Sequence, residues 1–234
     1  MKKRLFITIA ILVLLIGGIY IFLSVKHKHS PEIFYAVATL PPPPASDSQE
    51  AKIDEIMRQK GVALRHSKEL KNITILADIY KLNQLERFFT QITGTTISPE
   101  KTPQLHAILE EISFTAKRAA GKAKKKFDRP RPFVIHPEDS TCSPISPSGS
   151  YPSFHTASTW SVGLVLSKVI PEKSDIILQQ AARLGASRWQ CGYHWYSDVE
   201  ASKNMVNGIF NRSMENSDFR SRLSNAKEEI QRQK

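Results

Sequence analysis

The chain has 234 residues, of which 41% are hydrophobic and 24% charged, and these ordinary proportions exclude long disorder outside its ends. Its 33 Lys and Arg residues outnumber 22 Asp and Glu residues, so the net charge is +11 and anionic partners are favoured. No zinc finger, aromatic RNA-binding motif or basic heptad region is present, which argues against nucleic acid as a specific partner.

The first thirty residues carry a membrane signal. After a basic start, residues 5–25 form an uncharged run of 21 residues. At about 1.5 Å per residue this run can cross a hydrocarbon core of ~30 Å. The nearest small-residue cleavage site, at 36–38, lies well past the run, which favours an uncleaved signal anchor over a cleaved signal. We predict a cytoplasmic stub and transmembrane anchor over 1–30, although Lys26 and Lys28 weaken the charge argument for this orientation.

A linker and a helical domain are expected next. The run Leu40–Pro44 favours polyproline II and cannot be helical, which predicts a Pro-rich linker over 31–45. Helical periodicity then runs to the end of the chain, so we predict an all-α fold, a single helical-bundle domain over 46–234. The apolar stripe from Leu105 to Ile112 predicts a helix over about 103–125.

The other expected helices are shorter. One, capped by Ser46 or Asp47, is predicted to carry Ile53, Ile56 and Met57 on one face. The stretch 139–150 is dense in Ser, Pro and Gly and is predicted to be an ordered loop. Further helices are predicted over 73–82, 85–92, 156–169, 174–186 and 198–210, with Ser217 capping a final one.

Cys142 and Cys191 are the two cysteines of the chain. In an oxidising compartment such a pair often forms a disulfide. Two buried free thiols are the alternative, and the residues alone leave both open.

A basic stretch is the first to suggest chemistry. Lys124 and Arg131 are seven residues apart, so two helical turns would place them near one face before the chain breaks at Pro130 and Pro132. An Arg fork and a Lys point charge suit a tetrahedral dianion. For this stretch in isolation, a solvated basic run is the competing interpretation.

The second stretch places Ser153 and His155 two residues apart at the entry to an apolar helix. Free backbone N–H groups point at an anion in such a position. The competing interpretation is that Ser153 is a plain N-terminal cap.

The third stretch runs from Ser187 to Asp198. If it is helical, His194 and Asp198 share a face at a spacing of four residues. A carboxylate bonded to one ring nitrogen fixes the tautomer and leaves the other nitrogen free to attack. A surface His–Asp pair is the alternative.

The order and spacing of the three stretches resemble the signature of the type 2 phosphatidic acid phosphatase superfamily, which includes vanadium haloperoxidases: Lys-x6-Arg-Pro, Pro-Ser-x-His and Ser-Arg-x5-His-x3-Asp. The likeness extends to the bacterial class A nonspecific acid phosphatases. It covers most of 40–232, is strongest over 122–203, and includes stretches like theirs at 40–44, 127–133, 149–153 and 191–198.

The resemblance implies a role for each site residue. His194 is expected to be the nucleophile that becomes phosphohistidine, oriented by Asp198, and His155 the general acid that then activates water. The resemblance further implies metal-independent hydrolysis of phosphate monoesters without a cofactor, and a disulfide between Cys142 and Cys191. Its remaining implied members hold phosphate oxygens: Lys124, Arg131, Ser153 and Arg188.

Phe154 departs from the family, which has glycine between the Ser and the His of the second motif. Phenylalanine restricts φ and adds bulk at the rim of the phosphate site. A tolerated change, an altered substrate range or a crippled site are the three outcomes. We expect an active but slower or more selective enzyme, in which Phe154 stacks on an aromatic leaving group.

The partners implied are small phosphorylated substrates, and the inner membrane through residues 5–25. The domain is expected on the periplasmic side of that membrane, or in the periplasm or outside the cell if the anchor is cleaved. Because family members include homo-oligomers, a homo-oligomer is also possible as a partner state. The alternatives are a phosphate-binding homologue impaired by Phe154, and a lipid or isoprenoid phosphatase, whose multi-span architecture is absent. A serine hydrolase based on Ser148 or Ser153 would lack the nucleophile elbow, and a zinc site would lack normal ligand spacing.

Overall fold

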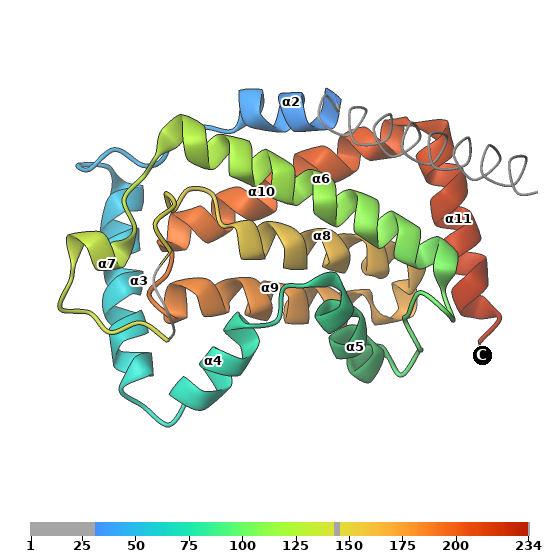
Figure 1. The fold of residues 1–234 in the computed structure, drawn as a ribbon, viewed down its shortest axis with the longest axis horizontal. Helices are drawn as coiled ribbons and strands as arrows, with labels where there is room; N and C mark the ends of the chain where they lie inside the picture. The colour runs from blue at the N-terminus through green and yellow to red at the C-terminus, as the bar shows by residue number, and fades with distance from the viewer. Residues whose placement is uncertain (1–30, 143–145, 234) are drawn as a thin grey trace, which may run out of the picture.

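The computed structural model describes residues 31–142 and 146–233, so the anchor predicted over 5–25 lies outside the described residues. Within these two ranges every regular element is helical, which confirms the predicted all-α fold (Figure 1). None of the helices described there has both the length and the apolar character that a membrane span requires.

The centre of the bundle is α8 (Phe154–Val169), which packs against α6 (Pro103–Phe127), α9 (Ser174–Gln190) and α10 (Tyr196–Glu215). Eleven of the 16 residues of α8 are buried, and many of them are small. Glycine is needed where α8 meets α9, because a Cβ on Gly163 would lie 2.5 Å from the Cβ of Ala181. Small side chains therefore let the two helices run close together.

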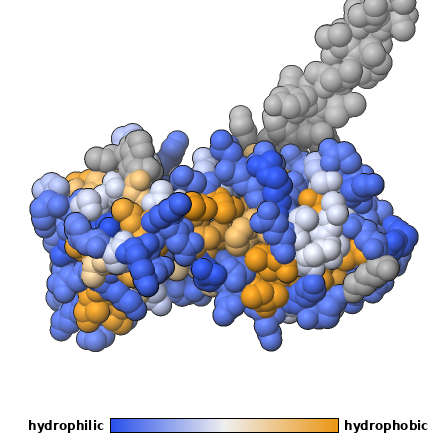
Figure 2. Space-filling model, turned by 90° about the horizontal axis from the view of Figure 1, so that it is seen from below, coloured by the Kyte–Doolittle hydropathy of each residue, from blue (hydrophilic) through white to orange (hydrophobic). Residues whose placement is uncertain are grey.

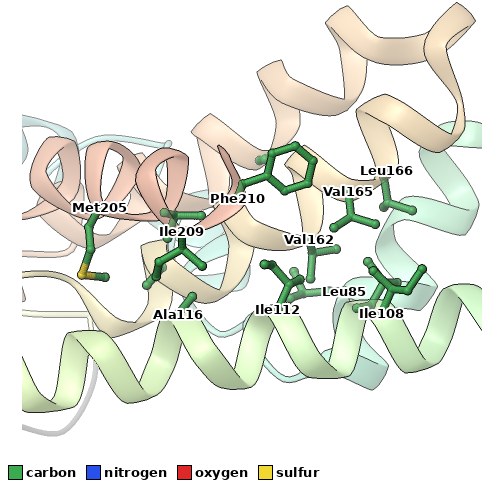
Figure 3. Close-up of a cluster of buried hydrophobic side chains, with 14 of the residues drawn as sticks. Leu85, Ile108, Ile112, Ala116, Val162, Val165, Leu166, Met205, Ile209 and Phe210 are labelled. Atoms are coloured by element: carbon green, nitrogen blue, oxygen red, sulfur yellow. The ribbon is translucent and has the colours of Figure 1, made fainter. Parts of the chain in front are cut away.

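An apolar cluster fills the space between α6, α8 and α10 (Figure 3). Ile112 of α6, Val162 of α8 and Ile209 of α10 are each no more than 2% exposed. Leu85 of α5 (Leu82–Thr93) closes the cluster from a fourth helix. Truncating one such side chain to alanine typically costs about 2–5 kcal/mol, so this cluster contributes strongly to the stability of the bundle.

The predicted linker over 31–45 is wrong in its first part. Pro31–Thr39 forms a helix, α2, which buries Ile33 and Ala36 against α6 and α10. Pro31 opens the helix, where the missing N–H costs nothing because first-turn donors have no partner within the helix. The proline run 41–44 is non-helical, as predicted.

Helix α3 (Gln49–Arg65) is capped by the Ser48 side chain rather than by Ser46 or Asp47. The apolar face expected for it points outward, since Ile53 and Ile56 are 39% and 63% exposed. The helix buries Asp54 instead, at 2% exposure. Polar contacts, described below, thus decide how α3 sits on the domain.

Most remaining helices agree with their predicted positions, with shifted ends. The helix predicted over 73–82 ends early at Ala77, and residues 78–81 are not helical. Helices α9 and α10 extend beyond the prediction, and Asn216 rather than Ser217 caps the last helix. The outer elements are α4 (Leu70–Ala77), α7 (Pro132–Ile135) and α11 (Ser217–Gln231).

Cys142 and Cys191 form a disulfide, which confirms the pairing that the resemblance implied. It joins the loop after α7 to the end of α9. The described parts of the predicted loop 139–150 are irregular, as expected. On the face drawn in Figure 2, hydrophilic residues predominate with hydrophobic patches between them, a mixture that is ordinary for a folded domain.

Candidate active site

The three sequence stretches meet at one end of the bundle, around a cavity of about 380 Å³. The last turn of α6, the first turn of α8, the last turn of α9 and the residues before α10 all reach it. It is lined by Asp78, Tyr80, Lys124, Arg131, Ser146, Ser148, Phe154, His155, Arg188, Tyr193 and His194. The structure therefore brings six of the eight predicted site residues to one cavity, and the other two, Ser153 and Asp198, are fully buried and do not line it.

Three buried cations, Lys124, Arg131 and Arg188, form a cationic cradle in this cavity and are 6–9% exposed. Lys124 Nζ donates to the carbonyl oxygens of Gly149 and Ser150, at 2.7 and 2.9 Å. Arg131 donates to the carbonyl oxygens of Ser148 and Tyr193, at 2.7 and 2.8 Å. Backbone oxygens thus fix the cradle without neutralising it, which suits an anionic ligand.

Arg188 is held less completely. Its Nη1 donates to the Ala77 carbonyl at 2.7 Å, and its guanidinium lies 4.3 Å from the ring centroid of Tyr193. Its Nε is buried and finds no hydrogen-bond partner among the described residues. An unpaired buried donor costs about 1–3 kcal/mol, so an anion that bonds this group would bind with that gain.

His194 carries the geometry of a nucleophile. Its Nδ1 lies 3.3 Å from Oδ2 of Asp198, and its Nε2 lies 3.2 Å from Nη1 of Arg131 in the cradle. A carboxylate acceptor favours the proton on Nδ1, which leaves the Nε2 lone pair facing the cradle. The pair is buried, not on the surface, and His194 lies in the loop before α10 rather than in a helix.

His155 is the second residue of α8, and its ring lies 4.0 Å from that of Tyr80, centroid to centroid. Ser153 caps α8, because its Oγ accepts the backbone N–H of Thr156 at 3.3 Å and also the Thr156 hydroxyl at 2.9 Å. The capping role that competed with phosphate binding is therefore formed, and a bond from Ser153 to phosphate stays a prediction. Other N–H groups of this first turn are left for an anion.

Burial lowers every basic pKa in the cavity, and neighbouring positive charge lowers the pKa further for all of these groups except Arg131. Burial, then Arg188 and the other two cations, lower the pKa of His155 to about 2. Burial and the same cations lower the pKa of His194 well below its ordinary value. Burial and then Arg131 lower the pKa of Lys124 to about 7. A bound dianion would counter this repulsion, so substrate binding itself would raise these pKa values.

Comparison with known proteins shows the family to which the chain belongs. Residues 109–210 match the model of the PAP2 superfamily. The chain is 34% identical over 214 residues to a non-specific acid phosphatase of Providencia stuartii, covering 86% of each. The chain belongs to the PAP2 superfamily. A second relative, a non-specific acid phosphatase of Salmonella typhimurium, is 34% identical over 218 residues, covering 88% of this chain and 85% of that protein.

Two solved structures share the fold. A bacterial vanadium-dependent iodoperoxidase aligns with a TM-score of 0.56 at 17% identity, covering 74% of this chain and 52% of that one. A transmembrane phosphatidylglycerolphosphate phosphatase of Bacillus subtilis aligns with a TM-score of 0.52 at 16% identity, covering 77% and 89%. At these identities the likeness concerns the fold alone.

Sequence reasoning missed some residues of this PAP2 site. Asp78 and Tyr80 line the cavity from the turn after α4, which no motif marked. Arg129 and Asp54 lie behind Asp198, and only Arg129 fell within a quoted stretch. Across residues 31–142 and 146–233, no group of three or more His, Cys, Asp or Glu side chains is placed to hold a metal ion.

Proposed function

We propose that this PAP2 protein is a non-specific acid phosphatase that hydrolyses phosphate monoesters through a phosphohistidine intermediate. The observation that carries the proposal is the placement of His194 between Asp198 on Nδ1 and the cradle on Nε2. The 34% identity to non-specific acid phosphatases over most of both chains supports the same conclusion.

In the first half-reaction, His194 Nε2 attacks phosphorus and forms an N–P bond while the ester P–O bond breaks. His155, protonated in the presence of the dianion, gives its proton to the departing alkoxide, and the alcohol leaves. The cradle stabilises charge on the three equatorial oxygens of the transferring phosphoryl group. Asp198 stabilises the positive charge that His194 acquires.

In the second half-reaction, His155 is neutral and takes a proton from water as that water attacks phosphorus. The N–P bond breaks, inorganic phosphate forms, and His194 returns to its neutral state. His155 ends protonated, ready for the next ester. Both steps use side chains of this chain, and the proton returns to where it began.

Phe154 gives a reason to expect selectivity for the leaving group. Its ring lines the cavity and meets the His155 ring edge-on, with centroids 6.2 Å apart, while Tyr80 covers His155 from another direction. A leaving group departing past His155 would therefore touch two aromatic rings. We propose a preference for aryl over alkyl phosphates; a site that binds phosphate without turnover is the second candidate, and Phe154 is its support.

We also propose that residues 5–25 anchor the domain on the periplasmic side of the inner membrane. The apolar run and the Cys142–Cys191 disulfide support this location. Five residues separate the run from α2, a reach of at most roughly 20 Å. In Figure 1, α2 and α4 lie on opposite edges of the bundle, and Asp78, which directly follows α4, lines the cavity.

The test is hydrolysis of p-nitrophenyl phosphate by the purified full chain, with chelator present, beside His194→Ala. We expect metal-independent turnover that the variant abolishes. If the chain binds phosphate tightly but shows no turnover, and Phe154→Gly restores turnover, the second candidate is favoured and the proposed activity is overturned.

A further inference from the structure

The stretch 127–133 contains two arginines, and the cradle uses one of them, Arg131. The other, Arg129, does not line the cavity and lies behind the nucleophile. Its Nη1 donates to Oδ1 of Asp198 at 2.7 Å and to the Ser197 hydroxyl at 2.8 Å. Its Nη2 donates to Oδ2 of Asp54 at 2.8 Å. One guanidinium therefore joins two buried carboxylates.

Asp54 is the outer member of this cluster. It comes from α3, and its Oδ1 accepts the backbone N–H of Ser197 at 2.7 Å, in the first turn of α10. Its Oδ2 accepts the Ser197 hydroxyl at 2.6 Å as well as the bond from Arg129. Burying a carboxylate is costly, and these charge-assisted bonds offset that cost.

The sequence of α3 indicates that these contacts are not a by-product of packing. The helix leaves Ile53 and Ile56 exposed and turns Asp54 inward, which is the reverse of an ordinary amphipathic orientation. Polar contacts rather than apolar burial must therefore keep the face of α3 that carries Asp54 against α10.

We propose that Asp54 and Arg129 are positioning residues for phosphoryl transfer, which hold Asp198 so that it orients His194; this rests on the proposed function. Oδ1 of Asp198 is bound by Arg129, and Oδ2 is shared by the backbone N–H of Trp195 at 2.9 Å and Nδ1 of His194 at 3.3 Å. A carboxylate held at both oxygens cannot turn about its Cβ–Cγ bond. The imidazole it bonds is then fixed in tautomer and direction.

Charge gives the arrangement a second effect. Burial raises the pKa of Asp198, and Arg129 is the first group that lowers it again. Removing the positive charge of Arg129 should therefore move the protonation of Asp198 to higher pH. Removing the negative charge of Asp54 should not, because Arg129 would remain.

The experiment compares Arg129→Gln, Arg129→Lys and Asp54→Asn in the full chain, with Glu86→Gln as the control. Glu86 is a buried carboxylate paired with His106 on other helices. For p-nitrophenyl phosphate we expect kcat to fall by about 10–100-fold in Arg129→Gln and about 10-fold in Asp54→Asn, with KM within about twofold. The fall of kcat at acidic pH, which reports protonation of Asp198, should begin at a higher pH in Arg129→Gln. It should be unchanged in Asp54→Asn and in Arg129→Lys.

A binding readout separates positioning from folding. Orthovanadate can accept a fifth ligand and so mimic the transition state, so we expect its binding to depend on a bond from His194 and that of phosphate to depend on the cradle alone. By calorimetry we expect orthovanadate affinity to fall about tenfold in Arg129→Gln and Asp54→Asn, with phosphate affinity unchanged and both affinities unchanged in Glu86→Gln.

The inference would be overturned if Arg129→Gln and Asp54→Asn both kept kcat within twofold of the unmodified chain. Equal losses of affinity for orthovanadate and phosphate would also overturn it. If Arg129→Gln does not fold, the isosteric Asp54→Asn decides alone. An unmodified chain without turnover would overturn the proposed function instead, and the orthovanadate comparison, which needs no turnover, would still decide the positioning role.

Discussion

Val162 in the middle of α8 and Ser153, which caps its N-terminus, are equally buried but are held by different forces. In the middle, Val162 packs against Ile112 and Ile209 in an apolar cluster. At the N-terminal end, Ser153 is just as inaccessible, but its neighbours are polar: its backbone N–H donates to the Asp198 carbonyl, and its own carbonyl accepts the Ser202 hydroxyl. Packing of the first kind mainly sets stability, whereas the second kind sets the directions of a few polar atoms.

The largest expected effect comes from Asp198→Asn at the polar end. The change keeps the shape of the side chain but removes the charge that fixes the His194 tautomer. We expect kcat for p-nitrophenyl phosphate to fall roughly 10³–10⁴-fold, as tautomer loss does in other His–Asp pairs. Steady-state kinetics measures this, and a loss below tenfold would show that the polar end does not work through this pair.

The apolar cluster should respond in the opposite way. Ile112→Ala removes a side chain that is 2% exposed, and we expect it to lower the free energy of unfolding by about 2–5 kcal/mol. Below the unfolding transition, kcat and KM should stay within twofold. Urea unfolding measures the loss of stability, and steady-state kinetics on the same protein measures kcat and KM. A large change in kcat or KM in a folded Ile112→Ala protein would contradict the distinction between the apolar cluster and the polar end.

Helix periodicity predicted the apolar stripe of α6, and the resemblance to a known family named all three residues of the cradle. The apolar spacing from Leu105 to Ile112 was enough for α6, and the three motifs were enough for His194 and Arg188. The role of α3 could not be predicted this way, because Asp54 is buried through partners 75 and 143 residues away. The helix at Pro31–Thr39 was missed for the same reason: its burial depends on α6 and α10.

The pH dependence of activity should report the crowding of cations. In the free protein the pKa of Lys124 is lowered to about 7, so Lys124 loses its charge as the pH rises through that value. We expect kcat/KM, which reports the free enzyme, to fall above about pH 7. Lys124→Arg keeps its charge and should move this alkaline limb upward; an unmoved limb would assign it to another group.

The smallest expected effect is on selectivity. Phe154→Gly removes an aromatic wall of the cavity, and we expect the ratio of kcat/KM for phenyl phosphate to that for an alkyl phosphate to fall about 2–10-fold, as an aromatic contact of about 0.5–1.5 kcal/mol implies. Val134→Gly, a change at an exposed residue of α7 that does not line the cavity, is the matched control. An unchanged ratio would remove Phe154 from leaving-group recognition.

The phosphohistidine itself is the central claim, and rapid quenching tests it most directly. The full chain would be mixed with a radiolabelled phosphate monoester, quenched in alkali, in which phosphohistidine is stable, and mapped by mass spectrometry. We predict a covalent phosphate on His194 that forms and decays at rates compatible with kcat. Label on Ser148 or Ser153, or turnover without any phosphorylated His194, would contradict the account.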